Sequence, residues 1–324
     1  MTGVITLSLE IELGWGYHDL GRFDRLSRGR RWETKTLHRL LNLCDELDLP
    51  ITFDVVGHLL HEPPVSYDTP HTDDWFDSIP NNRDPLFYAP DLVEAIQEAD
   101  TEHEICTHTY SHALCGNIPT HVLEWELRRA NEVQQEIGET SVSLVPPRHS
   151  QPAKEVLRDS NIEIVRVIGN DPAPTKLHKL NRLVFEPQEP IEPRMIDGVV
   201  ETYCSGYSTL TAATLASGVK PPLSMFRAIP TAVRQRLHER YLIRAMEKAI
   251  EQDSYIHLWS HLHDMANDDQ WPPIRTFLRS LAEQRDLGTL TVMPMEELNE
   301  HVRVTSTEST GTRPEDREIT KMGQ

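Results

Sequence analysis

The sequence predicts an α/β protein whose parallel strands close into a single barrel. Three observations indicate this fold. Predicted strands, in which apolar and polar residues alternate, are followed along the chain by predicted helices with apolar residues every three or four positions. This order of strands and helices is typical of a parallel sheet. The length of 324 residues suits one large barrel domain. The polar residues that stand out follow predicted strands, and in such barrels the chemistry lies at the carboxyl ends of the strands.

The first strand is predicted over residues 4–13. Its odd positions from residue 5 onward are all apolar, whereas Ser8, Glu10 and Glu12 occupy even positions. A period of two is typical of a strand with one apolar face. The two glutamates should therefore point the same way, about 7 Å apart along the strand, near its carboxyl end.

The elements that follow continue the alternation. Strands are expected over 51–57, 103–108, 142–146, 162–169, 255–261 and 287–293. Helices are expected over 37–47, 89–99 with Asp91 as cap, 120–138, 152–160, 231–252 and 271–285. Residues 60–88 are expected to form a long loop, and residues 170–230 irregular structure with one or two strands. One domain is predicted over residues 1–303, followed by a disordered tail over 304–324, where almost every residue is polar.

The composition restricts the class of partner. Fifty-one acidic residues against 32 basic ones give a formal net charge of −19. A negative surface repels nucleic acid and anionic membranes, so neither is predicted as a partner, and it suits a halophilic protein. No apolar run approaches the roughly 20 residues of a transmembrane segment, and the first residues lack the pattern of a signal peptide. We expect a cytoplasmic protein, of unknown oligomeric state.

The strongest chemical signal is the sequence EHEICTHTYSH, residues 102–112. On one turn of helix His108 and His112 would face the same way, which suits two ligands of one metal ion. Two histidines on the surface of a helix are the alternative. The pair directly follows a predicted strand, however, and Glu10 and Glu12 end another. We therefore predict a site of two imidazoles and one carboxylate, which leaves positions for water and substrate.

These motifs resemble those of the polysaccharide deacetylases, carbohydrate esterase family 4 with its NodB-homology domain. Residues 108–112 match the H-(S/T)-x-x-H core of the second motif, and LSLEIELGWG resembles the first. VPPRHS and IHLWSH resemble the third and fifth motifs. The resemblance covers residues 3–295 and implies a distorted (β/α) barrel of about seven parallel strands. Both acids of the first motif are glutamates where the family has aspartates, and a fourth motif is not found.

A second acidic sequence resembles the family's first motif only superficially. TFD, residues 52–54, copies the beginning of the family's TFDD. No second acid follows Asp54, and the segment comes after the first helix. We assign it to the second strand instead.

The resemblance implies a set of metal ligands, namely Glu12, His108 and His112. Their ion would be divalent. Zinc is the expected metal for two imidazoles and one carboxylate, and cobalt, nickel, manganese or iron would also bind such a set.

The resemblance also implies the catalytic groups. Glu10 would act as general base, and Arg148 would position it. His261, at the end of the strand over 255–261, would protonate the leaving amine, with His263 as the alternative acid.

The implied reaction is the removal of an N-acetyl or similar acyl group from an amino sugar in a glycan or a glycan precursor. A cytoplasmic location would make a lipid-linked or nucleotide-linked sugar the expected substrate. Three alternatives stay open. They are a catalytically weak or inactive relative that only binds glycans, an amidase acting on a small non-sugar amide, and a two-metal phosphoesterase.

Overall fold

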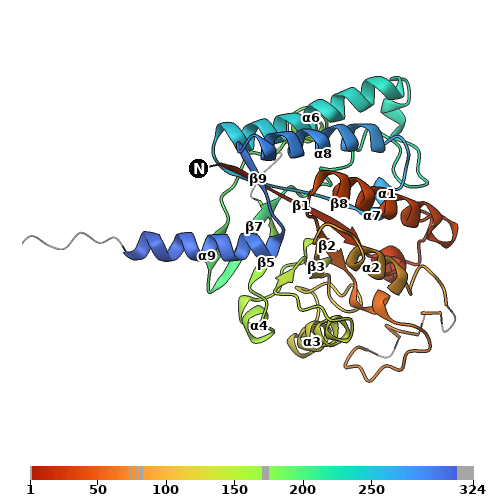
Figure 1. The fold of residues 1–324 in the computed structure, drawn as a ribbon. Helices are drawn as coiled ribbons and strands as arrows, with labels where there is room; N and C mark the ends of the chain where they lie inside the picture. The colour runs from red at the N-terminus through yellow and green to blue at the C-terminus, as the bar shows by residue number, and fades with distance from the viewer. Residues whose placement is uncertain (1, 73, 78, 81–82, 170–174, 312–324) are drawn as a thin grey trace, which may run out of the picture.

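The computed structural model describes residues 2–72, 74–77, 79–80, 83–169 and 175–311 (Figure 1). Seven parallel strands close into a barrel in the order β1-β2-β3-β4-β5-β7-β8, and β8 pairs back onto β1. The strands are β1 (Gly3–Ile11), β2 (Thr52–Val55), β3 (Glu104–Thr107), β4 (Ser143–Leu144), β5 (Ile164–Ile168), β7 (Val199–Cys204) and β8 (Tyr255–His261). The predicted barrel is confirmed.

Two further strands extend the sheet. β6 (Arg194–Ile196) pairs antiparallel with β7, and β9 (Leu290–Val292) pairs parallel with residues 3–5 of β1. β2 pairs with residues 8–11 of the same strand, so both halves of β1 are hydrogen-bonded. The register sets Glu10 beside Asp54 of β2 and His261 of β8. Three ionisable side chains thus meet on neighbouring central strands.

Helices surround the barrel, with α1, α6 and α8 on one side and α3 and α4 on another (Figure 1). Their bounds are α1 (Arg31–Leu47), α2 (Pro90–Gln97), α3 (Thr120–Glu136), α4 (Lys154–Asp159), α5 (Lys176–Val184), α6 (Thr231–Glu251), α7 (Leu262–Met265), α8 (Trp271–Asp286) and α9 (Met295–Gly311). Among the described residues, no helix has the length and apolar character needed to cross a membrane.

The alternation in β1 separates two environments. Its odd apolar residues, such as Leu7 and Leu9, belong to the core that the helices share. The even residue Ser8 points the other way, because its hydroxyl oxygen lies 2.9 Å from both Arg166 Nη1 and His257 Nε2. All three of these polar residues are fully buried. The barrel interior is consequently polar and charged, and its charges must be compensated from within.

Three predicted boundaries or caps need correction. Ala89 is the N-cap residue of α2, and Asp91 instead forms an ion pair of 2.6 Å with Arg30. Residues 176–184 form α5, although residues 170–230 were expected to be irregular with one or two strands because the region is rich in proline. α9 passes through the predicted tail boundary at 304, because Leu298 and Val302 are buried in its first half and the helix continues to residue 311. The rest of the predicted tail, 312–324, lies outside the described residues, as do residues 170–174.

Candidate active site

Glu10 and Glu12 reach the same site by different backbone conformations. β1 ends at Ile11, and Glu12 already has helical dihedral angles (φ −112°, ψ −24°) as the N-cap of the 3-10 helix η1 (Leu13–Leu20). The predicted strand therefore ends two residues early. Gly16 packs directly on the Glu12 carboxylate, and a Cβ atom at that position would collide with it. The sequence GWG thus allows η1 to close over Glu12.

His108 and His112 lie in a loop, and their predicted placement on a turn of helix is wrong. The loop follows β3, and Thr109 (φ 60°) and His112 (φ 61°) both adopt left-handed conformations that interrupt a helix. Glu126 of α3 stabilises this loop by accepting hydrogen bonds from the Ser111 backbone N–H (2.8 Å) and hydroxyl (2.5 Å). The two imidazole rings nevertheless lie side by side, with centroids 5.1 Å apart.

The two imidazoles face the Glu12 carboxylate. Glu12 Oε2 lies 2.8 Å from His112 Nε2 and 3.8 Å from His108 Nε2. His108 Nδ1 lies 2.6 Å from the carbonyl oxygen of Val145. Since a carbonyl only accepts, Nδ1 carries the proton and the lone pair of Nε2 faces the cluster. One ligand atom from each of the three buried residues lies within 4.8 Å of the other two.

This cluster fits a cation. Within the described part of the chain, no hydrogen-bond partner satisfies His108 Nε2 or His112 Nε2, although both are buried. Burial lowers the pKa of His112, which favours the neutral imidazole that metal binding requires. Burial also opposes protonation of His108, but Glu12 and Glu10 outweigh it and raise the pKa of that imidazole. The negative field that attracts a proton there would equally attract a metal ion.

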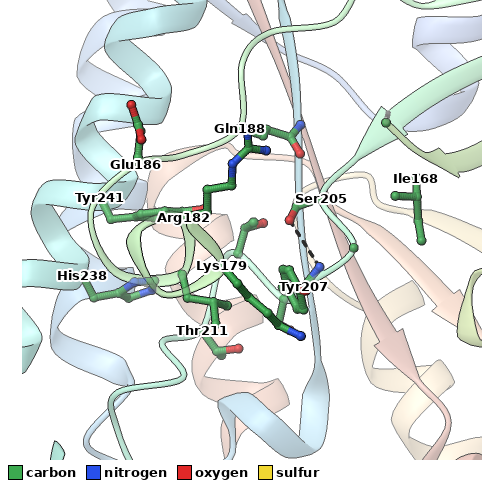
Figure 2. A pocket seen from close by; sticks show the side chains of 15 residues that line it. Ile168, Lys179, Arg182, Glu186, Gln188, Ser205, Tyr207, Thr211, His238 and Tyr241 are labelled. Atoms are coloured by element: carbon green, nitrogen blue, oxygen red, sulfur yellow. Dashed lines mark hydrogen bonds between the residues drawn. The ribbon is translucent and has the colours of Figure 1, made fainter. Parts of the chain in front are cut away.

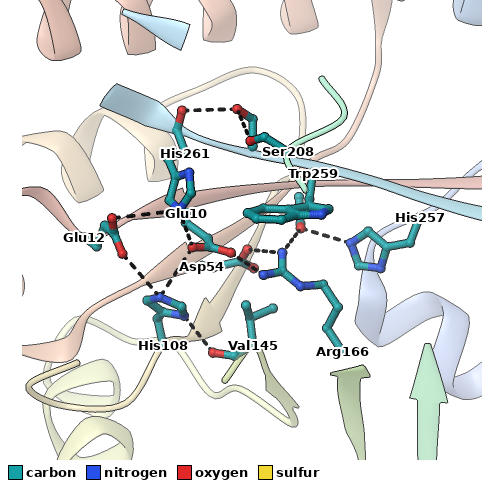
Figure 3. A network of polar contacts seen from close by, with 12 residues as sticks. Glu10, Glu12, Asp54, His108, Val145, Arg166, Ser208, His257, Trp259 and His261 are labelled. Carbon is teal, nitrogen blue, oxygen red and sulfur yellow. Dashed lines mark hydrogen bonds and ion pairs between the residues drawn. The ribbon is translucent and has the colours of Figure 1, made fainter. Parts of the chain in front are cut away.

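Glu10 is compensated by the protein itself (Figure 3). Its Oε1 forms a buried ion pair with Arg166 of β5, and its Oε2 lies 3.2 Å from His261 Nε2. Burial alone would raise the pKa of Glu10, but the charges of Arg166 and His261 hold it well below the usual range. Glu10 is therefore ionised and can accept a proton.

Arg166 organises the barrel interior. Its guanidinium lies 3.4 Å from Asp54 Oδ2, and its Cζ lies 4.6 Å from the centroid of the Trp259 ring. Burial raises the pKa of Asp54 to about 7, even though Arg166 acts in the opposite direction. Asp54 was correctly assigned to the second strand, and it joins the charged network there. A lone arginine in the apolar strand IVRVI was the sequence signal for Arg166.

His261 ends β8 and faces the cavity with 24% of its side chain exposed. Its Nδ1 donates to Asp264 Oδ2 at 2.9 Å, which leaves Nε2 directed at Glu10. Burial lowers its pKa, but the carboxylates of Glu10 and Glu12 outweigh burial and raise that pKa well above the ordinary value. His263 is 2% exposed and its Nε2 lies 2.7 Å from the Tyr17 hydroxyl. The geometry thus distinguishes His261 as the histidine open to a substrate.

Arg148 does not contact Glu10. It binds Asp19 (Nη2–Oδ1 2.7 Å) and donates to the carbonyl oxygen of Gly16 (3.0 Å). The position beside Glu10 that the sequence resemblance implied for Arg148 is occupied by Arg166. Arg148 still lies at the cavity, where it holds η1 in place.

Glu10, Glu12, Arg148 and His261 line a cavity of about 440 Å³. Carboxylates and His261 form part of its lining, together with aromatic, basic and small residues from η1 and the loops. The lining consists of Glu10, Glu12, Gly16, Tyr17, Leu20, Arg22, Asp24, Arg25, Arg148, His149, Gly206, Lys220, Trp259 and His261. The volume falls within the range of small-molecule sites, so the cavity can admit one sugar residue or a comparable amide.

The parallel barrel clusters carboxylates and imidazoles at the carboxyl ends of its strands, where barrel enzymes have their active sites. Residues 22–163 match the polysaccharide deacetylase family model. This match and the structural neighbours support a hydrolase acting on amide carbon–nitrogen bonds. The match includes His108, His112 and Arg148, while the other predicted site residues lie outside it.

Solved structures share the fold. A protein of Mycobacterium smegmatis described as a polysaccharide deacetylase aligns with a TM-score of 0.61 at 17% identity, covering 99% of this chain and 95% of that one. One of Pseudomonas aeruginosa PAO1, described in the same way, has a TM-score of 0.58 at 12% identity, with 92% and 90% covered. An allantoinase, PuuE, has a TM-score of 0.56 at 12% identity, with 93% and 90% covered. No curated protein matches the sequence.

Proposed function

We propose that the protein is a metal-dependent hydrolase that removes an N-acetyl or similar acyl group from an amino sugar in a glycan or glycan precursor. The observation that carries this proposal is the meeting of two kinds of group. His108 Nε2 and His112 Nε2, which have no hydrogen-bond partner among the described residues, face the Glu12 carboxylate, and directly beside them Glu10 and His261 form a base and acid pair. The match of residues 22–163 to the polysaccharide deacetylase model supports the reaction class.

Glu12, His108 and His112 would hold the ion. A divalent metal bound there, zinc being the one we expect for this donor set, would polarise the amide carbonyl and lower the pKa of water. The hydrogen bond from His108 Nδ1 to Val145 fixes the imidazole in the tautomer that ligation needs.

Glu10 would accept the proton of the attacking water. Its carboxylate is ionised at neutral pH, since Arg166 and His261 hold its pKa low. Arg166 also fixes the orientation of Glu10, because it is fully buried and additionally bonded to Ser8. A positioned base of this kind contributes about 10²–10⁴ to the rate.

His261 would then protonate the departing amine. Its raised pKa keeps the imidazole protonated, and the Asp264 carboxylate fixes the ring through Nδ1. The proton on Nε2 is thereby directed toward the space above Glu10 and Glu12, which lie 3.2 Å and 3.9 Å from it.

The second candidate is an amidase acting on a small non-sugar amide. The cavity of about 440 Å³ suits such a molecule as well, and the PuuE allantoinase shares the fold. The catalytic groups would keep the same roles, and only the substrate would differ.

The test measures metal content by mass spectrometry and acetate release from N-acetylglucosamine and its oligomers. Allantoin serves as a non-sugar amide, and its hydrolysis is measured as loss of allantoin. We expect about one metal ion per chain in the wild type. His108→Ala/His112→Ala should lose both the metal and acetate release. His121→Ala, an exposed histidine of α3, is the control and should keep both.

A wild type that binds no metal after reconstitution contradicts the proposed mechanism and favours a glycan-binding role. Metal binding with hydrolysis of allantoin alone establishes the amidase instead.

A further inference from the structure

Basic side chains gather at the mouth of the catalytic cavity. The whole chain has 51 acidic residues and 32 basic ones. Away from Glu10 and Glu12, however, the lining of this cavity contains four basic residues and one acidic residue, Asp24. The basic residues are Arg22, Arg25, Arg148 and Lys220. The rim thus has the opposite charge balance to the rest of the protein.

Two of these cations are already paired, and two are available. Arg148 binds Asp19 at 2.7 Å, and Lys220 binds Asp24 at 3.0 Å. Arg22 and Arg25 are exposed, and among the described residues no carboxylate forms an ion pair with either. Arg25 lies with its Cζ 5.9 Å from the centroid of the Tyr17 ring, which itself lines the cavity.

The guanidiniums of Arg22 and Arg25, which form no ion pair with a described carboxylate, therefore border the one described cavity that contains the predicted catalytic groups. A guanidinium presents a rigid fork of donors that matches phosphate and carboxylate oxygens. Cations at the rim of a negatively charged protein also raise the local concentration of an anionic substrate. A neutral sugar could accept hydrogen bonds from these donors but would gain no attraction between opposite charges.

A second cavity is adjacent to the catalytic one. It measures about 430 Å³ and shares Gly206 with the catalytic cavity. Lys179 and Tyr207 line it, and Lys179 Nζ lies 4.7 Å from the centroid of the Tyr207 ring (Figure 2). It offers an alternative location for a charged group, and none of the proposed catalytic residues lines it.

We propose that the substrate carries a negatively charged group, a phosphate or a carboxylate, which Arg22 and Arg25 bind at the rim while the amide lies over Glu10 and Glu12. This inference rests on the proposed hydrolase function and specifies its substrate class. An anionic sugar derivative should accordingly be a better substrate than the neutral sugar.

The experiment compares three probes on metal-loaded enzyme at low salt. They are N-acetylglucosamine, N-acetylglucosamine 1-phosphate and N-acetylmuramic acid, which distinguish neutral, phosphate and carboxylate chemistry. The readout is the ratio of kcat/KM for each charged probe to kcat/KM for the neutral one. We expect a ratio well above one in the wild type, and a decrease of about tenfold in Arg22→Ala/Arg25→Ala. Arg28→Ala removes an exposed arginine outside the cavity and should keep the wild-type ratio.

Outcomes separate this inference from the function on which it rests. If no probe is hydrolysed, the proposed function fails. If kcat/KM for the neutral probe equals kcat/KM for the charged probes, the proposed hydrolase function stands and only the anion site is overturned. If Lys179→Ala lowers the ratio while Arg22→Ala/Arg25→Ala does not, the assignment to the rim is wrong. A preference that weakens as salt rises supports it, because salt screens exposed charges.

Discussion

Glu10 and Glu12 stand two residues apart at the end of β1, yet the protein surrounds their carboxylates differently. Glu10 is neutralised by Arg166 from across the barrel and by His261. Glu12 faces two imidazoles whose Nε2 atoms have no hydrogen-bond partner among the described residues. The Glu10 half of the site is electrostatically complete without any addition. The negative charge of Glu12 is compensated only when neighbouring imidazoles are protonated or a cation binds.

This difference has a physical consequence. A buried carboxylate needs a counter-charge, and the two glutamates obtain theirs differently. Glu10 has the permanent charge of Arg166, whereas Glu12 depends on the titratable imidazoles of His261 and His112, whose charges outweigh burial and lower its pKa. Removing the Glu10 carboxylate should leave a positive charge unpaired. Removing the Glu12 carboxylate should instead remove the affinity for a cation.

The largest expected effect comes from testing the two glutamates separately. Glu12→Gln should lose the bound metal and at least about 10³ of the hydrolysis rate, because the charged ligand is gone. Glu10→Gln should keep the metal and lose about 10²–10⁴ of the rate, because only the base is missing. Metal stoichiometry and acetate release measure both. Equal metal loss in the two variants would contradict the division between the halves.

The next effect concerns which arginine serves Glu10. Arg166→Met leaves Glu10 and Asp54 buried without their cation and should destabilise the fold by about 3–5 kcal/mol. Arg148→Met removes a half-exposed ion pair with Asp19 and should cost about 1 kcal/mol or less. Urea unfolding of both variants gives the comparison. If the costs are equal, Arg166 does not have the role assigned to it.

A smaller effect is expected at the proposed acid, His261. Asp264→Asn removes the carboxylate that fixes His261 and helps to raise its pKa. The acid works only while protonated, so activity falls as pH rises through its pKa. A lower pKa should move the alkaline limb of kcat/KM to lower pH, with a loss of about tenfold to a hundredfold at neutral pH. An unchanged limb would show that another group is the acid, and His263→Gln would then be examined.

The smallest effect should come from Asp54. Its pKa of about 7 in the folded protein lies above the ordinary value of 3.8, so its stabilising contribution is present at low pH and is lost as pH rises toward and through 7. Asp54→Asn should therefore reduce the loss of stability between pH 5 and 8, by on the order of 1 kcal/mol. Urea unfolding at both pH values tests this. If Asp54 is ionised throughout, the pH dependence will not change.

Much of the site was predictable because its residues follow regular local patterns. The period-two alternation of β1 placed Glu10 and Ser8 on one face, and the end of the strand over 255–261 placed His261 at the barrel rim. The conformation of residues 108–112 was not predictable in this way. A spacing of four residues occurs in helices and loops alike, and Glu126 of the following helix, α3, stabilises the loop through its side chain.

The sequence by itself determined which side chains face the barrel interior, because strand periodicity depends only on local backbone geometry. It also determined the chemical types available for a metal site. Only the tertiary structure decided which charges compensate one another. Arg166 is 156 residues from Glu10 in the sequence and contacts it because the barrel closes. Arg148, the arginine that the sequence resemblance implied for this position, pairs with Asp19 instead. Contacts between distant strands depend on strand order and register, and no local pattern specifies these.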